Sequence, residues 1–455
     1  MANIKLDNYK QFLKRFSDLK GIDLLISDMS GVLRGKRIQS SALEKVFKDG
    51  IYLPASVFAG DITGNTVEET GLGVFQGDSD RICKPIPRTL SKSPWYNKSM
   101  AQVLLTMYEQ DGTPFFADPR QLLEKVYSKF QELGFTPVVA VELEFYLIDN
   151  RRDKNKKPQP PISPATGKRD HNTQLYSIDD LDDYGEFLNA VATYAKSQGI
   201  PADTALSEYA PGQFEINLKH EPNPISACDN GVLLKRLVKG VAKKMGMIAT
   251  FMAKPYGQQA GSGMHIHCSL MDEEKNVFSD LKDSIGSSIL YHAVGGLAEI
   301  MKESMAIFCP NANSYRRFQP NLYVPMAPTW GVDNRTVALR IPTSSEKEKR
   351  IEHRVSGADA NPYLVMASLL AGIHHGITNK IDPPKISTGD AIAKHSPSLP
   401  MTWVESLNAF SKSKILKEYF GKEFCHVYYE TKNKEMQKFD SNVTPLELDW
   451  YLRTV

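Results

Sequence analysis

The chain has 455 residues, of which 41% are hydrophobic and 24% are charged, as in an ordinary water-soluble protein. Because a single hydrophobic core stops growing at roughly 250 to 300 residues, we expect two or more domains. The 55 basic and 53 acidic residues leave a net charge of +2, which argues against nucleic acid or an anionic membrane as the main partner.

The sequence predicts a cytoplasmic protein with reduced thiols and no membrane partner. Residues 1–25 carry Lys and Asp throughout and lack the apolar segment of a secretory signal. The apolar stretch 362–377 is too short for a membrane span and contains His374 and His375. The five cysteines are scattered, without a Cys-x-x-Cys pair that would suggest zinc or a redox couple.

The N-terminal part of the chain reads as a small β-rich domain. An amphipathic helix is expected to occupy the first twenty residues, followed by a short apolar strand at 23–27. The segment 54–87 is rich in Gly, Asp and Thr, which predicts loops joining short strands. Asp118 and Pro119 then have the types of a helix cap and a first-turn proline, with Gly134 at the expected end of that helix. We place the domain boundary here, between residues 1–116 and 117–455.

The next segments contain a long loop and a long helix. The stretch 150–169 is basic, proline-rich and aperiodic, so we interpret it as an exposed loop, with a phosphate-binding patch as the alternative. A long helix is predicted from Ser226, and its apolar stripe is interpreted as core packing. The stripe consists of Leu234, Leu237, Val238, Val241, Met245 and Ile248. The basic residues expected outside it are Lys235, Arg236, Lys239, Lys243 and Lys244. Further helices are predicted at Asn361–Pro362 and, from a capping box, at 444–447.

Paired carboxylates in the stretch 141–145 are the first sign of chemistry. Glu142 and Glu144 alternate with Val141, Leu143 and Phe145. On a strand both carboxylates would project from one face, about 7 Å apart, while the apolar side chains pack on the other. Like charges side by side are unfavourable unless a cation neutralises them or one takes up a proton. Alone, the pattern also fits a solvated strand face.

Two later segments repeat this arrangement of polar side chains. Glu208 and Glu215 stand on either side of a Pro211–Gly212 turn, so strands leaving the turn can return both carboxylates to one site. His265 and His267 share one face of a strand that follows a flexible glycine loop.

A further segment, 350–354, alternates in the same way and places Arg350, Glu352 and Arg354 on one face. Each segment alone is weak, but in this order and spacing their motifs resemble those of the glutamine synthetase family. The resemblance runs from the segment beginning at Asp28 to about Asn379. It implies an α+β protein with an N-terminal β-grasp domain and a glutamine synthetase-type α/β catalytic domain. It also implies stacked rings of subunits, with active sites between neighbours.

The resemblance implies two metal sites. Five carboxylates and one imidazole, without a thiolate, suit a hard cation such as Mg²⁺ or Mn²⁺. The metal that activates the amino-acid substrate would be bound by Glu144, Glu208 and Glu215. The metal that neutralises the ATP phosphates would be bound by Glu142, His265 and Glu352.

Substrate-binding positions follow from the same resemblance. The positions similar to ATP-binding residues are Asp203, His267, Ser269, Arg335, Arg340 and Lys347. The positions similar to glutamate-binding residues are Gly261, Arg317, Arg335 and Arg354. Arginine suits the latter role because a guanidinium group binds a carboxylate in a two-pronged geometry.

The amine pocket departs from that of an ammonia-using glutamine synthetase. Tyr323, in the segment 320–325, stands where the family has a glutamate that binds ammonium, and Ala260 replaces an asparagine before Gly-Ser-Gly. In the β-rich domain only Asp61 corresponds to the group that takes a proton from the incoming amine. These departures are similar to the γ-glutamylpolyamine synthetase branch, which joins glutamate to putrescine or related amines.

We therefore expect an ATP-dependent ligase that joins the γ-carboxylate of L-glutamate to an organic amine through a γ-glutamyl phosphate. An ammonia-using glutamine synthetase, a ligase for a small monoamine and a catalytically silent structural member remain as alternatives. The expected assembly is a homo-oligomer, a dodecamer of two stacked hexameric rings.

Overall fold

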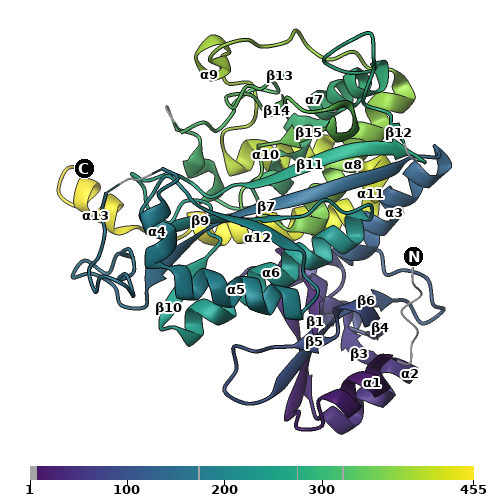
Figure 1. The fold of residues 1–455 in the computed structure, drawn as a ribbon, viewed down its shortest axis with the longest axis vertical. Helices are drawn as coiled ribbons and strands as arrows, with labels where there is room; N and C mark the ends of the chain where they lie inside the picture. Colours follow the sequence, from purple (N-terminus) through teal and green to yellow (C-terminus); the bar gives the residue numbers. More distant parts are fainter. Residues whose placement is uncertain (1–7, 173–174, 274, 320–321) are drawn as a thin grey trace.

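The computed structural model describes residues 8–172, 175–273, 275–319 and 322–455. Figure 1 shows a small sheet near the N-terminus and a larger sheet in the remainder of the chain, with helices packed around both. The small sheet has six strands in the order β2-β1-β6-β4-β3, with β5 paired to β6. Its strands are β1 (Gly21–Ser27), β2 (Leu33–Ile38), β3 (Ile51–Pro54), β4 (Asp80–Pro85), β5 (Ser91–Lys92) and β6 (Met100–Tyr108).

The large sheet has nine strands in the order β13-β14-β15-β11-β7-β9-β8, with β10 paired to β7 and β12 to β11. Its first strands are β7 (Thr136–Asp149), β8 (Ala202–Ser207), β9 (Gln213–Leu218), β10 (Met247–Thr250) and β11 (Met264–Asp272). The others are β12 (Lys275–Asn276), β13 (Trp330–Val332), β14 (Leu339–Ile341) and β15 (Ile351–His353). The long strand β7 lies between β9 and β11, so it positions the residues of both neighbours.

Helices supply the remaining core. Those of the first half are α1 (Asn8–Arg15), α2 (Leu43–Asp49), α3 (Pro119–Glu132), α4 (Ile178–Asp183), α5 (Gly185–Ser197) and α6 (Pro224–Lys244). Those of the second half are α7 (Ser288–Phe308), α8 (Pro362–Asn379), α9 (Ala391–Lys394), α10 (Trp403–Lys412), α11 (Lys414–Phe420), α12 (Lys422–Asp440) and α13 (Pro445–Tyr451). Val141, Leu143 and Phe145 of β7 are fully buried, and Val141 lies against Gly231 of α6. The apolar face of β7 therefore packs against helices, which leaves the opposite face for the carboxylates.

Local signals in the sequence predicted several helix ends correctly. The Asp118 side chain accepts a hydrogen bond from the backbone N–H of Arg120 at the start of α3, and Gly134 follows that helix with φ of +74°. The capping box of α13 forms between Thr444 and Glu447 as expected. The segment 150–169 contains no helix or strand beyond an isolated bridge between Ile162 and Arg169.

Two sequence expectations were wrong in detail. The N-terminal helix α1 spans only Asn8–Arg15, and the expected part within residues 1–7 lies outside the described residues. Met245 and Ile248 are 37% and 39% exposed rather than core residues, because α6 ends at Lys244 and the chain continues into β10. Lys235, expected outside the apolar stripe of α6, is partly buried and donates hydrogen bonds to the backbone.

All five cysteines are buried and unpaired, as expected for reduced thiols. Across the described ranges, every helix is too short or too polar to cross a membrane.

Candidate active site

Strand register gathers the carboxylates on one face of the large sheet. Glu144 of β7 lies directly opposite Glu215 of β9, and Glu142 lies opposite His265 of β11. Residues opposite each other on antiparallel strands project from the same face with their Cβ atoms about 5 Å apart. Glu208 directly precedes the β8–β9 turn, where its N–H donates to the carbonyl of Gln213. The alternation seen in the sequence thus brings four glutamates and a histidine to one region.

His265 stands between two groups of possible metal ligands. One atom from each of Glu142, His265 and Glu352 lies within 4.8 Å of the others, and the same holds for Glu144, Glu215 and His265. His265 Nδ1 is 3.3 Å from Glu142 Oε2, and its Nε2 is 3.9 Å from Glu144 Oε1. The first group is the same set that the sequence resemblance assigned to one metal.

The second group differs from the set that the resemblance suggested. Within the described part of the chain, Glu208 joins neither group, and His265 is close enough to contribute to both. The negative charge of Glu144 nevertheless raises the pKa of the Glu208 carboxyl. It therefore lies at the edge of the acidic cluster formed by Glu142, Glu144, Glu208, Glu215 and Glu352.

The glutamates on the two sides of the acidic cluster have pKa values shifted in opposite directions. Burial, reinforced by the charges of the neighbouring glutamates, raises the pKa of Glu215 well above its usual range and that of Glu208 to about 8. At Glu142 burial also raises the pKa, but hydrogen bonds from His265 and His267 outweigh it and hold the pKa well below its usual range. Burial is likewise outweighed at Glu352, where Arg354 and His265 lower the pKa to about 2. At Glu208 and Glu215, burial and the repulsion between the glutamates therefore outweigh any nearby positive charge.

The glycine-rich loop before β11 connects Arg317 to the acidic cluster. A Cβ at Gly261 would lie 2.7 Å from the Arg317 Cγ, and one at Gly263 would lie 3.3 Å from Glu144 Oε1 and 3.5 Å from Arg317 Nη2. The backbone N–H of Gly263 also donates to Glu144 Oε2 over 2.8 Å. Glycine is thus required for close packing here. The buried Arg317, in a 3-10 helix (Ser314–Arg317), donates to the carbonyl of Val355, while its Nε has no hydrogen-bond partner among the described atoms.

A second row of polar side chains crosses β11, β15 and β14. His267 lies opposite Glu352, and Glu352 lies opposite Arg340. Arg340 Nη1 is 2.9 Å from Glu352 Oε2, while Arg354 pairs with the other carboxylate oxygen. Arg340 also pairs with Asp333, so two carboxylates already hold this guanidinium. Ser269 extends the row on β11 and donates to the carbonyl of Val138 over 3.4 Å.

Sequence reasoning gave no role in the site to three residues that contact it. Gln213 donates to both Glu144 Oε2 and the Gly261 carbonyl, and its spacing of two from Glu215 on β9 is a signal that was available. Arg350 donates to His267 Nδ1 over 3.1 Å, which leaves His267 Nε2 to donate to Glu142 Oε1. His220 packs edge-on to His267, with ring centroids 5.9 Å apart, and no sequence pattern pointed to it.

Four other predicted site residues are exposed. Asp203 on β8 is exposed and pairs with Lys219 over 3.2 Å. Lys347 is exposed in a 3-10 helix (Glu346–Glu348). Arg335 is also exposed, but its charge lowers the pKa of Glu208, so it stands near that carboxyl. Tyr323 is 63% exposed with φ of +52°, and the adjoining Pro320 and Asn321 of the predicted amine-pocket segment lie outside the described residues.

Asp61 belongs to the part of the chain that forms the small sheet. Its carboxylate accepts hydrogen bonds from the backbone N–H groups of Thr63 and Asn65. Burial raises its pKa, but these hydrogen bonds and those from the Thr63 hydroxyl and Lys438 outweigh burial and lower the pKa to about 2. The loop is attached to α12, because the N–H of Ile62 donates to Glu435 Oε1 over 2.7 Å.

Comparison with known proteins shows to which family this chain is similar. The profile of the glutamine synthetase catalytic domain matches residues 116–451. The gamma-glutamylputrescine synthetase PuuA of Escherichia coli (strain K12) is 46% identical over 445 residues, covering 98% of this chain and 94% of that protein. The glutamate–isopropylamine ligase of a Pseudomonas species is 34% identical over 460 residues, covering 98% and 99% of the two chains.

A solved structure described as a GmaS–ADP complex has the same fold. It superposes with a TM-score of 0.83 at 24% identity, covering 97% of this chain and 98% of that chain. The sequence matches, the fold and the acidic cluster lead to one conclusion: this chain belongs to the glutamine synthetase family of carbon–nitrogen ligases.

Proposed function

We propose that this protein is an ATP-dependent ligase that joins the γ-carboxylate of L-glutamate to an organic amine, putrescine or another polyamine. The observation that carries the proposal is the acidic cluster around His265, with Arg317 beside it across Gly263. Five carboxylates facing one imidazole serve no packing purpose, whereas phosphoryl transfer depends on this kind of charge stabilisation. The naming of two similar proteins as ligases for putrescine and isopropylamine supports an organic amine.

The acidic cluster fits divalent cations. Its donors are carboxylate oxygens and an imidazole nitrogen, which suit Mg²⁺ or Mn²⁺. Burial and mutual repulsion raise the pKa of Glu208 and Glu215, so a cation bound beside them would stabilise their ionised carboxylates. The residues proposed to hold two cations are Glu142, Glu144, Glu208, Glu215, His265 and Glu352. Bound cations would neutralise the phosphates of ATP and the attacked carboxylate.

The protein's own residues would bind and orient glutamate. Arg317 and Arg354 offer guanidinium groups to its carboxylate, and each has an Nε without a hydrogen-bond partner in the described structure. The carbonyl of Gly261 accepts one hydrogen bond from Gln213 and has a second lone pair for the substrate ammonium. The γ-carboxylate of glutamate would then attack the γ-phosphate of ATP and form a γ-glutamyl phosphate.

ATP would be held by the polar row beside the acidic cluster. In this proposal Asp203, His267, Ser269 and Lys347 contact the nucleotide, while Arg335 and Arg340 neutralise its phosphates. Arg340 is already fixed by Glu352 and Asp333, so its planar fork is oriented before the nucleotide arrives. Phosphate is displaced in the second step, when the amine nitrogen attacks the γ-glutamyl carbonyl.

Asp61 and Tyr323 would receive the amine. The Asp61 loop belongs to the small sheet, away from the acidic cluster, so it would act in the site of a neighbouring subunit. Because its pKa is lowered to about 2, Asp61 stays ionised and attracts a cationic amine better than it accepts a proton. Tyr323 offers an aromatic face, on which each buried CH₂ of an alkyl amine gains about 0.8 kcal/mol.

A shared active site requires assembly, and the end of the chain supplies a surface for it. The exposed apolar residues of α13 and its flanks include Val443, Leu446, Trp450, Leu452 and Val455. Contiguous exposed apolar patches are typical of interaction surfaces. We propose that it contributes to the ring-shaped homo-oligomer, with two hexameric rings forming a dodecamer.

Phosphate release from ATP tests the proposal, with glutamate, Mg²⁺ and an amine each omitted in turn. We expect release only when all are present, and hydroxylamine should trap the intermediate as γ-glutamyl hydroxamate. Glu215→Ala should abolish release, whereas Asp272→Asn, on an exposed residue at the end of β11, should not. Release without glutamate, or full activity of Glu215→Ala, would contradict the proposal.

A further inference from the structure

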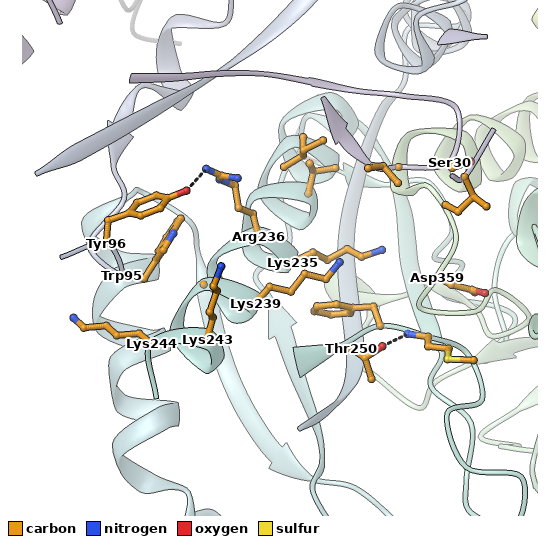
Figure 2. A pocket seen from close by; sticks show the side chains of 18 of the residues that line it. Ser30, Trp95, Tyr96, Lys235, Arg236, Lys239, Lys243, Lys244, Thr250 and Asp359 are labelled. Carbon is orange, nitrogen blue, oxygen red and sulfur yellow. Dashed lines mark hydrogen bonds between the residues drawn. The ribbon is translucent and has the colours of Figure 1, made fainter. Parts of the chain in front are cut away.

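A cavity lies between the small sheet and helix α6, and none of the glutamates of the acidic cluster lines it. Its volume is about 730 Å³, within the range of small-molecule sites. One wall is formed by the loop after β1, including Ser30, and by Trp95 and Tyr96. The opposite wall is formed by α6 and by β10 with the residues that follow it. Figure 2 shows the basic side chains of α6 lining this cavity.

The charges that line the cavity are almost all positive. Its lining contains five basic residues of α6 and a single acidic residue, Asp359. Three of the five have partners: Arg236 pairs with Asp23 over 2.6 Å, Lys244 donates to the Pro94 carbonyl and the Tyr194 hydroxyl, and Lys235 donates to the carbonyl of Ala358. The other two, Lys239 and Lys243, are exposed.

Lys235 and Lys239 lie close together, Lys235 partly buried and Lys239 exposed at the surface of the cavity. In Figure 2 their side chains run side by side toward the end of the cavity where Ser30 and Asp359 lie. Their Nζ atoms are 5.2 and 5.7 Å from the centre of the Phe251 ring. Burial, together with repulsion by Lys239, lowers the pKa of Lys235 to about 7, and burial also lowers the pKa of Lys239. An anion in the cavity would relieve both costs.

We propose that this cavity binds a small polyvalent anion, carrying two or more negative charges on phosphate or carboxylate groups. Lys239 and Lys243 would contact the anionic groups directly. Lys235, which donates to the carbonyl of Ala358 over 2.7 Å, would add its positive charge behind these two lysines. The aromatic side chains Trp95 and Phe251 supply apolar surface for the remainder of the ligand. Compact polyanions suit this lining, since five cations face one carboxylate.

The cavity also touches the Asp61 loop. Ser30 and Ile62 belong to its lining, and the same residues contact α12: Lys432 donates to the Ser30 hydroxyl and Glu435 accepts from the Ile62 N–H. A ligand that contacts Ile62 would therefore alter the position of Asp61 and change the rate of ligation. This regulatory consequence rests on the proposed function, whereas the binding site itself does not.

Direct binding tests the site without any turnover. Isothermal titration of the assembled protein with pyrophosphate and with citrate, in EDTA, should detect saturable binding of at least one, which identifies the ligand as phosphate or carboxylate. The double variant Lys239→Glu/Lys243→Glu should bind about tenfold or more weakly, because each reversal replaces an attraction by a repulsion. Lys302→Glu, on an exposed face of α7, is the matched control and should bind normally.

The phosphate-binding residues of the active site provide the second comparison. Arg340→Ala should leave binding to the cavity unchanged, because Arg340 lies in the row beside Glu352. Loss of binding in Arg340→Ala together with normal binding in the lysine double variant would assign the anion to the active site and overturn the proposal. If neither anion binds, the proposal is also overturned. This outcome is expected if a neighbouring subunit fills the cavity in the assembled protein.

Discussion

Without metal, Glu208 should make the protein less stable as the pH rises. Burial and the charge of Glu144 raise the pKa of this carboxyl to about 8, compared with 4.5 in an unfolded chain. The folded protein therefore keeps a proton that the unfolded chain loses, and stability falls between pH 4.5 and 8 at about 1.4 kcal/mol per pH unit. The loss is about 3 kcal/mol at pH 7 and about 5 kcal/mol at pH 8.

Glu208→Gln removes this titration while keeping the shape of the side chain. In EDTA at pH 8 we expect the variant to unfold about 5 °C higher than the wild type, since 1 kcal/mol corresponds to about 1 °C for a chain of this length. At pH 4.5, where the carboxyl is protonated in the folded wild type, the two proteins should unfold at similar temperatures. With Mn²⁺ the order should reverse, because the wild type gains binding free energy that the variant lacks.

Differential scanning calorimetry at the two pH values, with and without Mn²⁺, measures all four cases. Asp272→Asn is the control, because it removes an exposed carboxylate from β11 outside the cluster. An unfolding temperature of Glu208→Gln that equals or falls below that of the wild type in EDTA at pH 8 would refute the reasoning.

Three further predictions concern the amine side of the site and the assembly of subunits. Glu435→Gln leaves the buried Lys432 without its charge partner and weakens the hydrogen bond from the Ile62 N–H. We therefore expect the KM for the amine to rise severalfold while the KM for ATP stays unchanged. An equal rise in both KM values would indicate general damage to the protein. Tyr323→Glu should raise kcat/KM for ammonia relative to putrescine, and an unchanged ratio in steady-state assays would exclude Tyr323 from selectivity. Deletion of residues 443–455 should yield smaller oligomers in sedimentation, whereas an unchanged assembly would show that this apolar surface is not an interface.

The face of β7 that carries the acidic cluster could be predicted from the sequence because the signal is local. Alternation with a period of two placed Glu142 and Glu144 together, and the Pro211–Gly212 turn pairs β9 with β8, which brings Glu208 and Glu215 to the same end of that hairpin. The capped ends of α3 and α13 were predicted for the same reason, since a cap requires only a few adjacent residues.

Contacts between distant segments could not be predicted in this way. Glu435 and Ile62 are separated by 373 positions, and nothing in either segment indicates the other. Lys235 lies outside the apolar stripe of α6, as helical periodicity predicts, but its hydrogen bond to the Ala358 carbonyl involves a segment 123 positions away that the periodicity does not indicate. Arg350 was placed on the correct face, but its contact with His267 depends on the pairing of β15 with β11.

The choice of amine is the most direct test of the account. It is measured as kcat/KM for phosphate release across ammonia, methylamine, ethanolamine, isopropylamine and putrescine, with saturating glutamate, ATP and Mg²⁺. The account predicts that putrescine or another polyamine is used much more efficiently than ammonia, because Tyr323 offers apolar contact where a carboxylate would bind ammonium. Turnover of ammonia as efficient as that of the best organic amine would contradict it.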